Sequence, residues 1–124
     1  MGKCKTILVV DDDLFILDAF QSLLKWEGHR MIGARCISEA IEQLFKEQVD
    51  LVITEVNLVG LSATRLPGLI KQLDRDLPVV VMSDLEEMGS ARTLRQADLL
   101  LNKPLDLRET RAAITRLLTA GANA

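Results

Sequence analysis

At 124 residues, 48% of them hydrophobic, the chain has enough material for one compact domain and too little for two. Its net charge of -3 lacks the basic excess typical of nucleic-acid-binding domains. No stretch is apolar for long enough to span a membrane and no signal-peptide pattern is seen, so we expect a cytoplasmic protein.

The first predicted strand is the apolar run 6–10, and the helix after it has one apolar face. Hydrophobic side chains recur there with the i, i+3, i+4, i+7, i+8 spacing of a buried helical stripe. They are Ile16, Ala19, Phe20, Leu23 and Leu24. Gly28 is expected to end the helix, because glycine adopts the left-handed cap conformation at little cost. Trp26 is expected to pack at the helix end.

A second strand is expected over 30–34, followed by a helix that Ser38 can cap. The side chains of this helix that should face inward are Ala40, Ile41, Leu44 and Phe45. The two cysteines, Cys4 and Cys36, do not have the spacing of a metal site. We interpret both as small apolar or surface thiols.

The rest of the chain repeats the alternation of strand and helix three times. Strands are expected over 50–55, 78–82 and 98–102, and helices over 65–75, 86–95 and 106–118. The helix over 86–95 is expected to be weak, and Gly89 costs it about 1 kcal/mol relative to alanine. Proline costs about 3 kcal/mol inside a helix, so Pro67 predicts that the third helix starts late or is remodelled. Residues 1–120 are expected to form the domain, and 121–124 a tail or the start of a linker.

Several of the predicted strands are apolar at consecutive positions rather than alternate ones. This pattern is typical of parallel strands that are covered on both faces. Strand alternating with helix throughout predicts right-handed crossover connections. We therefore expect an α/β fold, a doubly wound five-stranded parallel sheet with five helices in three layers.

Polar residues gather where the predicted strands end. Asp11, Asp12 and Asp13 follow the first strand; Glu55 and Asn57 lie at the end of the third, Ser83 and Asp84 of the fourth, and Lys103 and Pro104 of the fifth. Each residue alone is explained as a helix cap or a solvated charge. Ligand sites in doubly wound sheets lie at this edge, however, and close carboxylates attract a cation such as Mg²⁺. Together the residues predict an acidic, metal-capable site that can hold phosphate oxygens.

The motifs ILVVDDD, DLVITEVNLVGLS, VVVMS and LNKP resemble, in order and position, those of bacterial response-regulator receiver domains. The resemblance covers essentially the whole chain. It implies a CheY-like, flavodoxin-like fold with strand order 2-1-3-4-5.

The resemblance also implies roles for the residues at the strand ends. Asp11 and Asp12 match the acidic metal pair, and Asn57 would supply a backbone carbonyl to Mg²⁺. The residues matching the switch and phosphate-binding positions are Ser83, the switch hydroxyl, Lys103, the phosphate-binding lysine, and Pro104, whose peptide is cis in the family.

Glu55 stands where the family has the aspartate that accepts phosphate. Its carboxylate extends further by roughly one C–C bond, about 1.5 Å, and a misplacement of about 1 Å can slow a reaction about a hundredfold. We therefore predict that Glu55 is a poor acceptor and that Mg²⁺ binding is weakened or absent. The preferred arrangement is a direct Glu55–Lys103 pair that imitates the phosphorylated product. The alternative is sequence drift in a domain that no longer needs a switch.

Further departures from the family pattern surround Glu55. Leu100 replaces the aromatic residue that usually switches with phosphorylation. Val59 replaces a proline, and Ala63 and Gln96 replace glycines. These changes indicate that the loops at the site have changed together.

We interpret the chain as an atypical receiver of a two-component or phosphorelay system, not an enzyme, that acts through protein contact. Its partner would be a sensor histidine kinase, a phosphotransfer protein or an output domain. Leu14, Phe15 and Leu17 lie off the buried stripe near the acidic edge; they are either ordinary exposed apolar residues or a docking patch for a helical partner. Binding to nucleic acid or membrane is not expected, and a homodimer is left open.

Three alternatives compete with this interpretation. The first is a working Mg²⁺-dependent receiver in which Glu55 or a neighbouring aspartate accepts phosphate. The second is a haloacid-dehalogenase-like phosphatase, whose Asp-x-Asp motif Asp11 and Asp13 satisfy, although the chain is short for that family. The third is a flavin-binding domain, which is less favoured because acidic residues follow the first strand in place of a phosphate-cradling loop.

Overall fold

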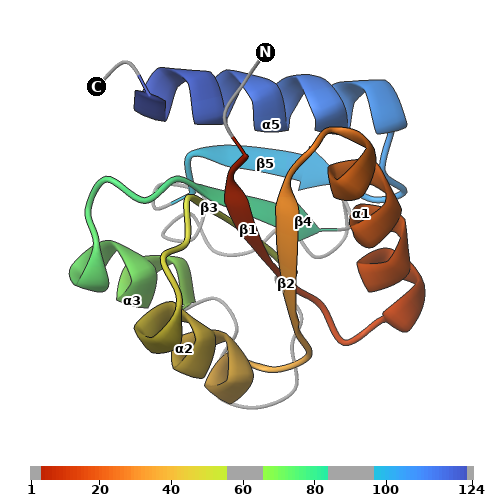
Figure 1. Cartoon of the computed structure of the whole chain (residues 1–124). Helices are drawn as coiled ribbons and strands as arrows, with labels where there is room; N and C mark the ends of the chain where they lie inside the picture. Colours follow the sequence, from red (N-terminus) through yellow and green to blue (C-terminus); the bar gives the residue numbers. More distant parts are fainter. Residues whose placement is uncertain (1–3, 56–65, 84–96, 123–124) are drawn as a thin grey trace.

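A computed structural model of the chain, shown in Figure 1, describes residues 4–55, 66–83 and 97–122. The strands are β1 (Thr6–Val10), β2 (Arg30–Ala34), β3 (Leu51–Glu55), β4 (Val79–Ser83) and β5 (Leu99–Asn102). They form one parallel sheet in the order β2-β1-β3-β4-β5. The predicted strand positions, parallel pairing and order are confirmed.

Helices cover both faces of this sheet, which gives the three layers that were predicted. The described helices are α1 (Leu14–Trp26), α2 (Ile37–Lys46), α3 (Leu66–Leu73) and α5 (Leu107–Ala122). Helices α1 and α5 pack on one face, and α2 and α3 lie on the other (Figure 1). The predicted helix over 86–95 lies outside the described residues.

The consecutive apolar residues of the strands serve two cores. Because side chains alternate along a strand, Ile7 and Val9 of β1 pack with α1 and α5, whereas Leu8 and Val10 pack with α2 and α3. All four side chains are fully buried. Because neither face of the sheet meets water, the strands do not need a polar residue at every second position.

The buried face of α1 agrees with the predicted one at Ile16, Phe20, Leu23 and Leu24, which lie in the core or pack against it. The buried residues are Leu17, Phe20 and Leu24, whereas Ala19 is exposed. Leu17 has i+3 and i+7 spacing to Phe20 and Leu24, so it belongs to the same buried stripe, and only Ala19 lies outside it. Leu17 is therefore not part of an exposed patch.

The helix ends agree with the sequence in part. Gly28 has the left-handed φ of 82° expected for the residue that ends α1. Trp26 is 80% exposed, so the expectation that it packs at the helix end was wrong. Helix α2 begins earlier than predicted, with Cys36 at the N-cap position, which puts Ser38 inside the first turn rather than at the cap. Phe45, expected to face inward, is exposed.

The later helices also depart from their predicted bounds. Pro67 is the second residue of α3, within the first turn, where proline is tolerated; the residues just before this helix lie outside the described ranges. Helix α5 continues to Ala122, beyond its predicted end at residue 118. None of the helices in the described ranges has the length and apolar character needed to cross a membrane.

Candidate functional site

The carboxyl ends of the strands bring the predicted polar residues to one edge of the sheet. Asp11 directly follows β1, and its backbone N–H donates to Ala34 O at 3.0 Å, which extends the pairing of β1 with β2. Glu55 and Ser83 are the last residues of β3 and β4, and both are buried. The backbone N–H of Lys103 donates to Ser83 O at 2.9 Å, so the chain after β5 is held against β4.

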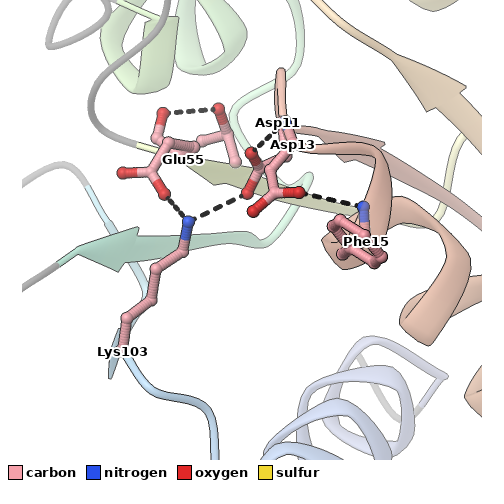
Figure 2. Close-up of polar contacts among 6 residues, drawn as sticks. Asp11, Asp13, Phe15, Glu55 and Lys103 are labelled. Atoms are coloured by element: carbon pink, nitrogen blue, oxygen red, sulfur yellow. Dashed lines mark hydrogen bonds and ion pairs between the residues drawn. The ribbon is translucent and has the colours of Figure 1, made fainter.

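The ammonium group of Lys103 lies between two carboxylates, as Figure 2 shows. It pairs with Glu55 Oε2 and lies 3.1 Å from Asp11 Oδ2. The Lys103 side chain is only 19% exposed, and those of Glu55 and Asp11 are buried. The predicted Glu55–Lys103 pair is confirmed, and Asp11 joins it, which the sequence did not predict.

The three consecutive aspartates have separate positions. Asp11 Oδ1 accepts a hydrogen bond from the Asp13 backbone N–H at 2.9 Å, so both of its oxygens are engaged. Asp13 is the N-cap of α1, and its Oδ1 accepts from the Phe15 N–H at 2.9 Å (Figure 2). Asp12 is exposed. Of the three, only Asp11 points its carboxylate at Lys103.

Burial and pairing shift two pKa values at this site. Burial raises the pKa of Asp11; the hydrogen bonds from Asp13 N–H and Lys103 oppose this rise, and the charge of Glu55 adds to it. For Lys103, burial acts to lower the pKa, but the hydrogen bonds to Glu55 and Asp11, together with their charges, outweigh it, so its pKa is raised. Lys103 is therefore protonated and supplies the positive charge between the carboxylates of Glu55 and Asp11.

In this arrangement two of the described carboxylates, Asp11 and Glu55, are paired with Lys103 rather than with a metal ion. Mg²⁺ takes oxygen ligands in near-octahedral geometry and usually one or two carboxylates. The oxygens of Asp11 are taken by Lys103 and the Asp13 amide, and Glu55 is paired with Lys103. Within residues 4–55, 66–83 and 97–122, no three acidic, histidine or cysteine side chains are grouped so as to hold a metal ion.

The remaining predicted residues divide into two groups. The Lys103–Pro104 peptide is cis, as the family resemblance implied. Leu100 is partly buried and packs against the core shared by α2 and α3. The residues whose positions lie outside the described ranges are Asn57, Val59, Ala63, Asp84 and Gln96.

Comparison with known proteins gives a consistent result. A family model described as the response regulator receiver domain matches residues 7–115. YbdJ of Bacillus subtilis, an uncharacterized transcriptional regulatory protein, is 34% identical over 104 residues, which cover 83% of this chain and 46% of that protein. Sporulation initiation phosphotransferase F of the same organism is 25% identical over 119 residues, or 94% of this chain and 96% of that protein. The chain thus spans less than half of the first relative and nearly all of the second.

A solved structure with the same arrangement of elements is the response regulator TrrA from Thermotoga maritima, in complex with Mg²⁺–BeF. It superposes with a TM-score of 0.83 at 25% identity, over 91% of this chain and 98% of that one. The similarity extends across the sheet and its helices.

Proposed function

The chain belongs to the response regulator receiver domain family, and from this premise we propose that it is an atypical receiver that signals without aspartyl phosphorylation. Receiver domains of two-component response regulators are signalling modules. In this one, Glu55 and Lys103 replace the phosphorylation switch by a permanent ion pair. The domain acts by protein contact and catalyses no reaction.

The observation that carries this proposal is the Lys103 ammonium held between Glu55 and Asp11. A lysine in this position stabilises the oxygens of a bound phosphoryl group by its charge. Here that charge is already neutralised by two buried carboxylates. An incoming phosphate would have to break a pair that lies largely out of water, where breaking a pair is costly.

The position of the Glu55 carboxylate supports the same conclusion. The carboxylate is displaced by about 1.5 Å relative to an aspartate at this position, and it points to Lys103 (Figure 2). In-line attack on a phosphodonor requires the oxygen to face the donor at close range, and a misplacement of about 1 Å costs about a hundredfold. Glu55 is therefore a poor nucleophile in this geometry.

Magnesium has a reduced role in this proposal. Asp11, Asp12 and the backbone carbonyl of Asn57 are the groups that would hold Mg²⁺, and the ion would supply charge to neutralise phosphate oxygens. Lys103 already neutralises Asp11, so the domain binds Mg²⁺ weakly or not at all. Ser83 and Leu100 would then no longer report phosphorylation.

The partner we propose is a protein: a sensor histidine kinase, a phosphotransfer protein or an output domain. Phe15 is 85% exposed at the start of α1, beside the acidic edge, and Leu14 is exposed next to it. Contiguous apolar surface of this kind tends to mark protein contacts. The cytoplasmic location and the absence of nucleic-acid binding expected from the sequence stay predictions.

Incubation with acetyl phosphate and Mg²⁺, followed by intact-mass measurement, tests the proposal. We expect no phosphate adduct on the native chain and a measurable adduct on Glu55→Asp, whose shorter side chain restores the acceptor geometry. Glu55→Gln serves as the matched control, because it keeps the length of the side chain and removes the charge. A stoichiometric adduct on the native chain would contradict the proposal and favour the working Mg²⁺-dependent receiver.

A further inference from the structure

A hollow of about 290 Å³ opens between helices α2 and α3. Its apolar lining residues are Leu44, Phe45, Val49, Ile70, Leu73 and Leu77. We call this surface the α2–α3 groove. An apolar cavity of about 150 Å³ is enough to hold benzene, so the groove has room for an aromatic side chain and a neighbour.

The rim of the groove is more exposed than its floor. Phe45 of α2 is 73% exposed and Leu73 of α3 is 52% exposed, whereas Ile70 and Leu77 are buried. Single exposed apolar residues are ordinary on protein surfaces. Here two of them, from adjacent helices, flank one hollow with an apolar floor, which is the form of a contact site rather than of scattered exposure.

Acidic side chains surround one end of the groove. A second hollow, of about 190 Å³, shares Val49, Asp74 and Leu77 with it and is also lined by Asp50, Asp76 and Lys5. Three carboxylates and one ammonium therefore line this second hollow. Glu47, which lines the groove itself, already pairs with Arg30. The charge left at this end is negative.

We infer that the α2–α3 groove docks a helix of a partner protein that carries an apolar stripe bordered by Lys and Arg residues. Helices α2 and α3 lie side by side on the same face of the sheet (Figure 1). A third helix can lay its side-chain ridge into the groove between them, as amphipathic helices do in hydrophobic grooves. The acidic end selects a basic partner, because complementary charge adds specificity and speeds association.

This surface is separate from the site that contains Glu55 and Lys103. A helix that follows one parallel strand and leads to the next begins at the carboxyl edge of the sheet and ends at the amino edge. Phe45 and Leu73 stand at the ends of their helices, so the groove lies toward the edge opposite the acidic site. The inference holds whether or not position 55 is phosphorylated.

The test uses two labelled synthetic peptides of about 18 residues, roughly five helical turns, each with a Leu/Phe stripe. One has lysine and arginine beside the stripe, and the other has glutamate at those positions. We expect the domain to bind the basic peptide about tenfold or more tightly than the acidic one, measured by fluorescence anisotropy. Phe45→Ser and Leu73→Ser should each weaken binding of the basic peptide about tenfold, as is usual for anchor residues.

Trp26→Ser is the matched control, because Trp26 is 80% exposed and does not line the groove. It should leave the affinity unchanged. Asp74→Asn combined with Asp76→Asn should weaken binding and reduce its dependence on salt. All five substituted positions are exposed, so circular dichroism should show folded variants.

Three results would overturn the inference. The first is equal affinity for the two peptides. The second is a loss on Trp26→Ser as large as that on Phe45→Ser, which would indicate general stickiness. The third is a concentration-dependent dimer in sedimentation that Phe45→Ser abolishes, which would assign the groove to a second copy of the chain.

Discussion

The positive charge of Lys103 compensates the negative charges of two other residues. Glu55 and Asp11 are buried carboxylates, and each would repel the other without the ammonium between them. Buried ion pairs are not in themselves a strong source of stability, but removing one partner leaves an uncompensated charge, which is costly. The extra methylene of Glu55 brings its carboxylate to this ammonium, so the substitution and the pair are one structural change.

Replacing Lys103 with methionine should lower the free energy of unfolding by about 3 kcal/mol, the usual cost of breaking a buried pair. Urea denaturation at neutral pH measures this loss. Lys46→Met is the matched control, because Lys46 forms only an exposed pair with Glu42, worth about 0–1 kcal/mol. The double variant Lys103→Met, Glu55→Gln should recover part of the loss, because it also removes one buried charge. Equal losses on Lys103→Met and Lys46→Met would contradict the structural role of the pair.

Cys36 is predicted to be a reactive thiol. Its Sγ lies 3.2 Å from the Ser38 hydroxyl, and this hydrogen bond, with that of the Glu39 backbone N–H, lowers the pKa of Cys36 below its usual 9.0. A lowered pKa means that the thiolate, the reactive form, is present at lower pH. In a Cys4→Ser background, the rate of iodoacetamide alkylation should reach half its maximum below pH 9.0. Ser38→Ala should move that midpoint upward, and an unchanged midpoint would show that the hydroxyl is not the cause.

At the scale of helices and strands, the sequence predicts the sheet better than the helices. The strands were placed within a residue or two because each is a short apolar run, and β1, β3 and β4 are buried on both faces. Their order came with the family resemblance. The face of α1 was predicted correctly except at its border, where Leu17 is buried and Ala19 is exposed. Phe45 was misassigned, since it borders a groove that α2 and α3 form together.

In the candidate site, too, the sequence predicted some contacts and missed others. The positions of Glu55 and Lys103 at strand ends predicted that they would meet. The contact of Lys103 with Asp11 did not follow, because β3 and β4 lie between β1 and β5. At about 4.8 Å per strand, β1 and β5 are roughly 14 Å apart. The structure is needed to show that the Lys103 side chain extends far enough to contact Asp11.

The stability of helix α1 depends on the side chain that caps its N-terminus. Asp13 is the N-cap, and its Oδ1 accepts from Phe15 N–H at 2.9 Å. The first turn of α1 contains no acidic residue, so Asp13 is the nearest charge to complement the helix dipole. Asp13→Ala should lower the free energy of unfolding by about 1 kcal/mol in urea denaturation. Asp12→Ala, at an exposed position that does not cap the helix, should change it by less than about 0.5 kcal/mol; the reverse order would contradict the cap assignment.

For the whole molecule, an internal cation means that the fold carries its own counter-charge. A receiver that relies on a metal gains stability when the metal binds, because a ligand that binds only the folded state shifts the equilibrium toward it. Here Lys103 supplies that charge from within the chain. Under the proposed function, the acidic edge and the α2–α3 groove would each contact a protein without a bound metal ion.

The melting temperature of the native chain should therefore be the same in excess Mg²⁺ and in EDTA. The Glu55→Asp variant should melt at a higher temperature in Mg²⁺, because the shorter side chain moves away from Lys103 and leaves oxygens for the ion. Differential scanning calorimetry at one fixed ionic strength makes the comparison. A rise in the native chain as large as that in Glu55→Asp would show that Lys103 does not substitute for the metal.

The pairing of Glu55 with Lys103 also affects how long the signal of the domain lasts. An acyl phosphate is formed and hydrolysed, so a phosphorylated receiver has a lifetime that other enzymes can lengthen or shorten. A glutamate carboxylate is part of every copy from the moment the chain folds, and no hydrolase removes it. Under the proposed function, the strength of the signal depends on how many copies of the protein are present. The signal then changes only as fast as the cell synthesises and degrades those copies.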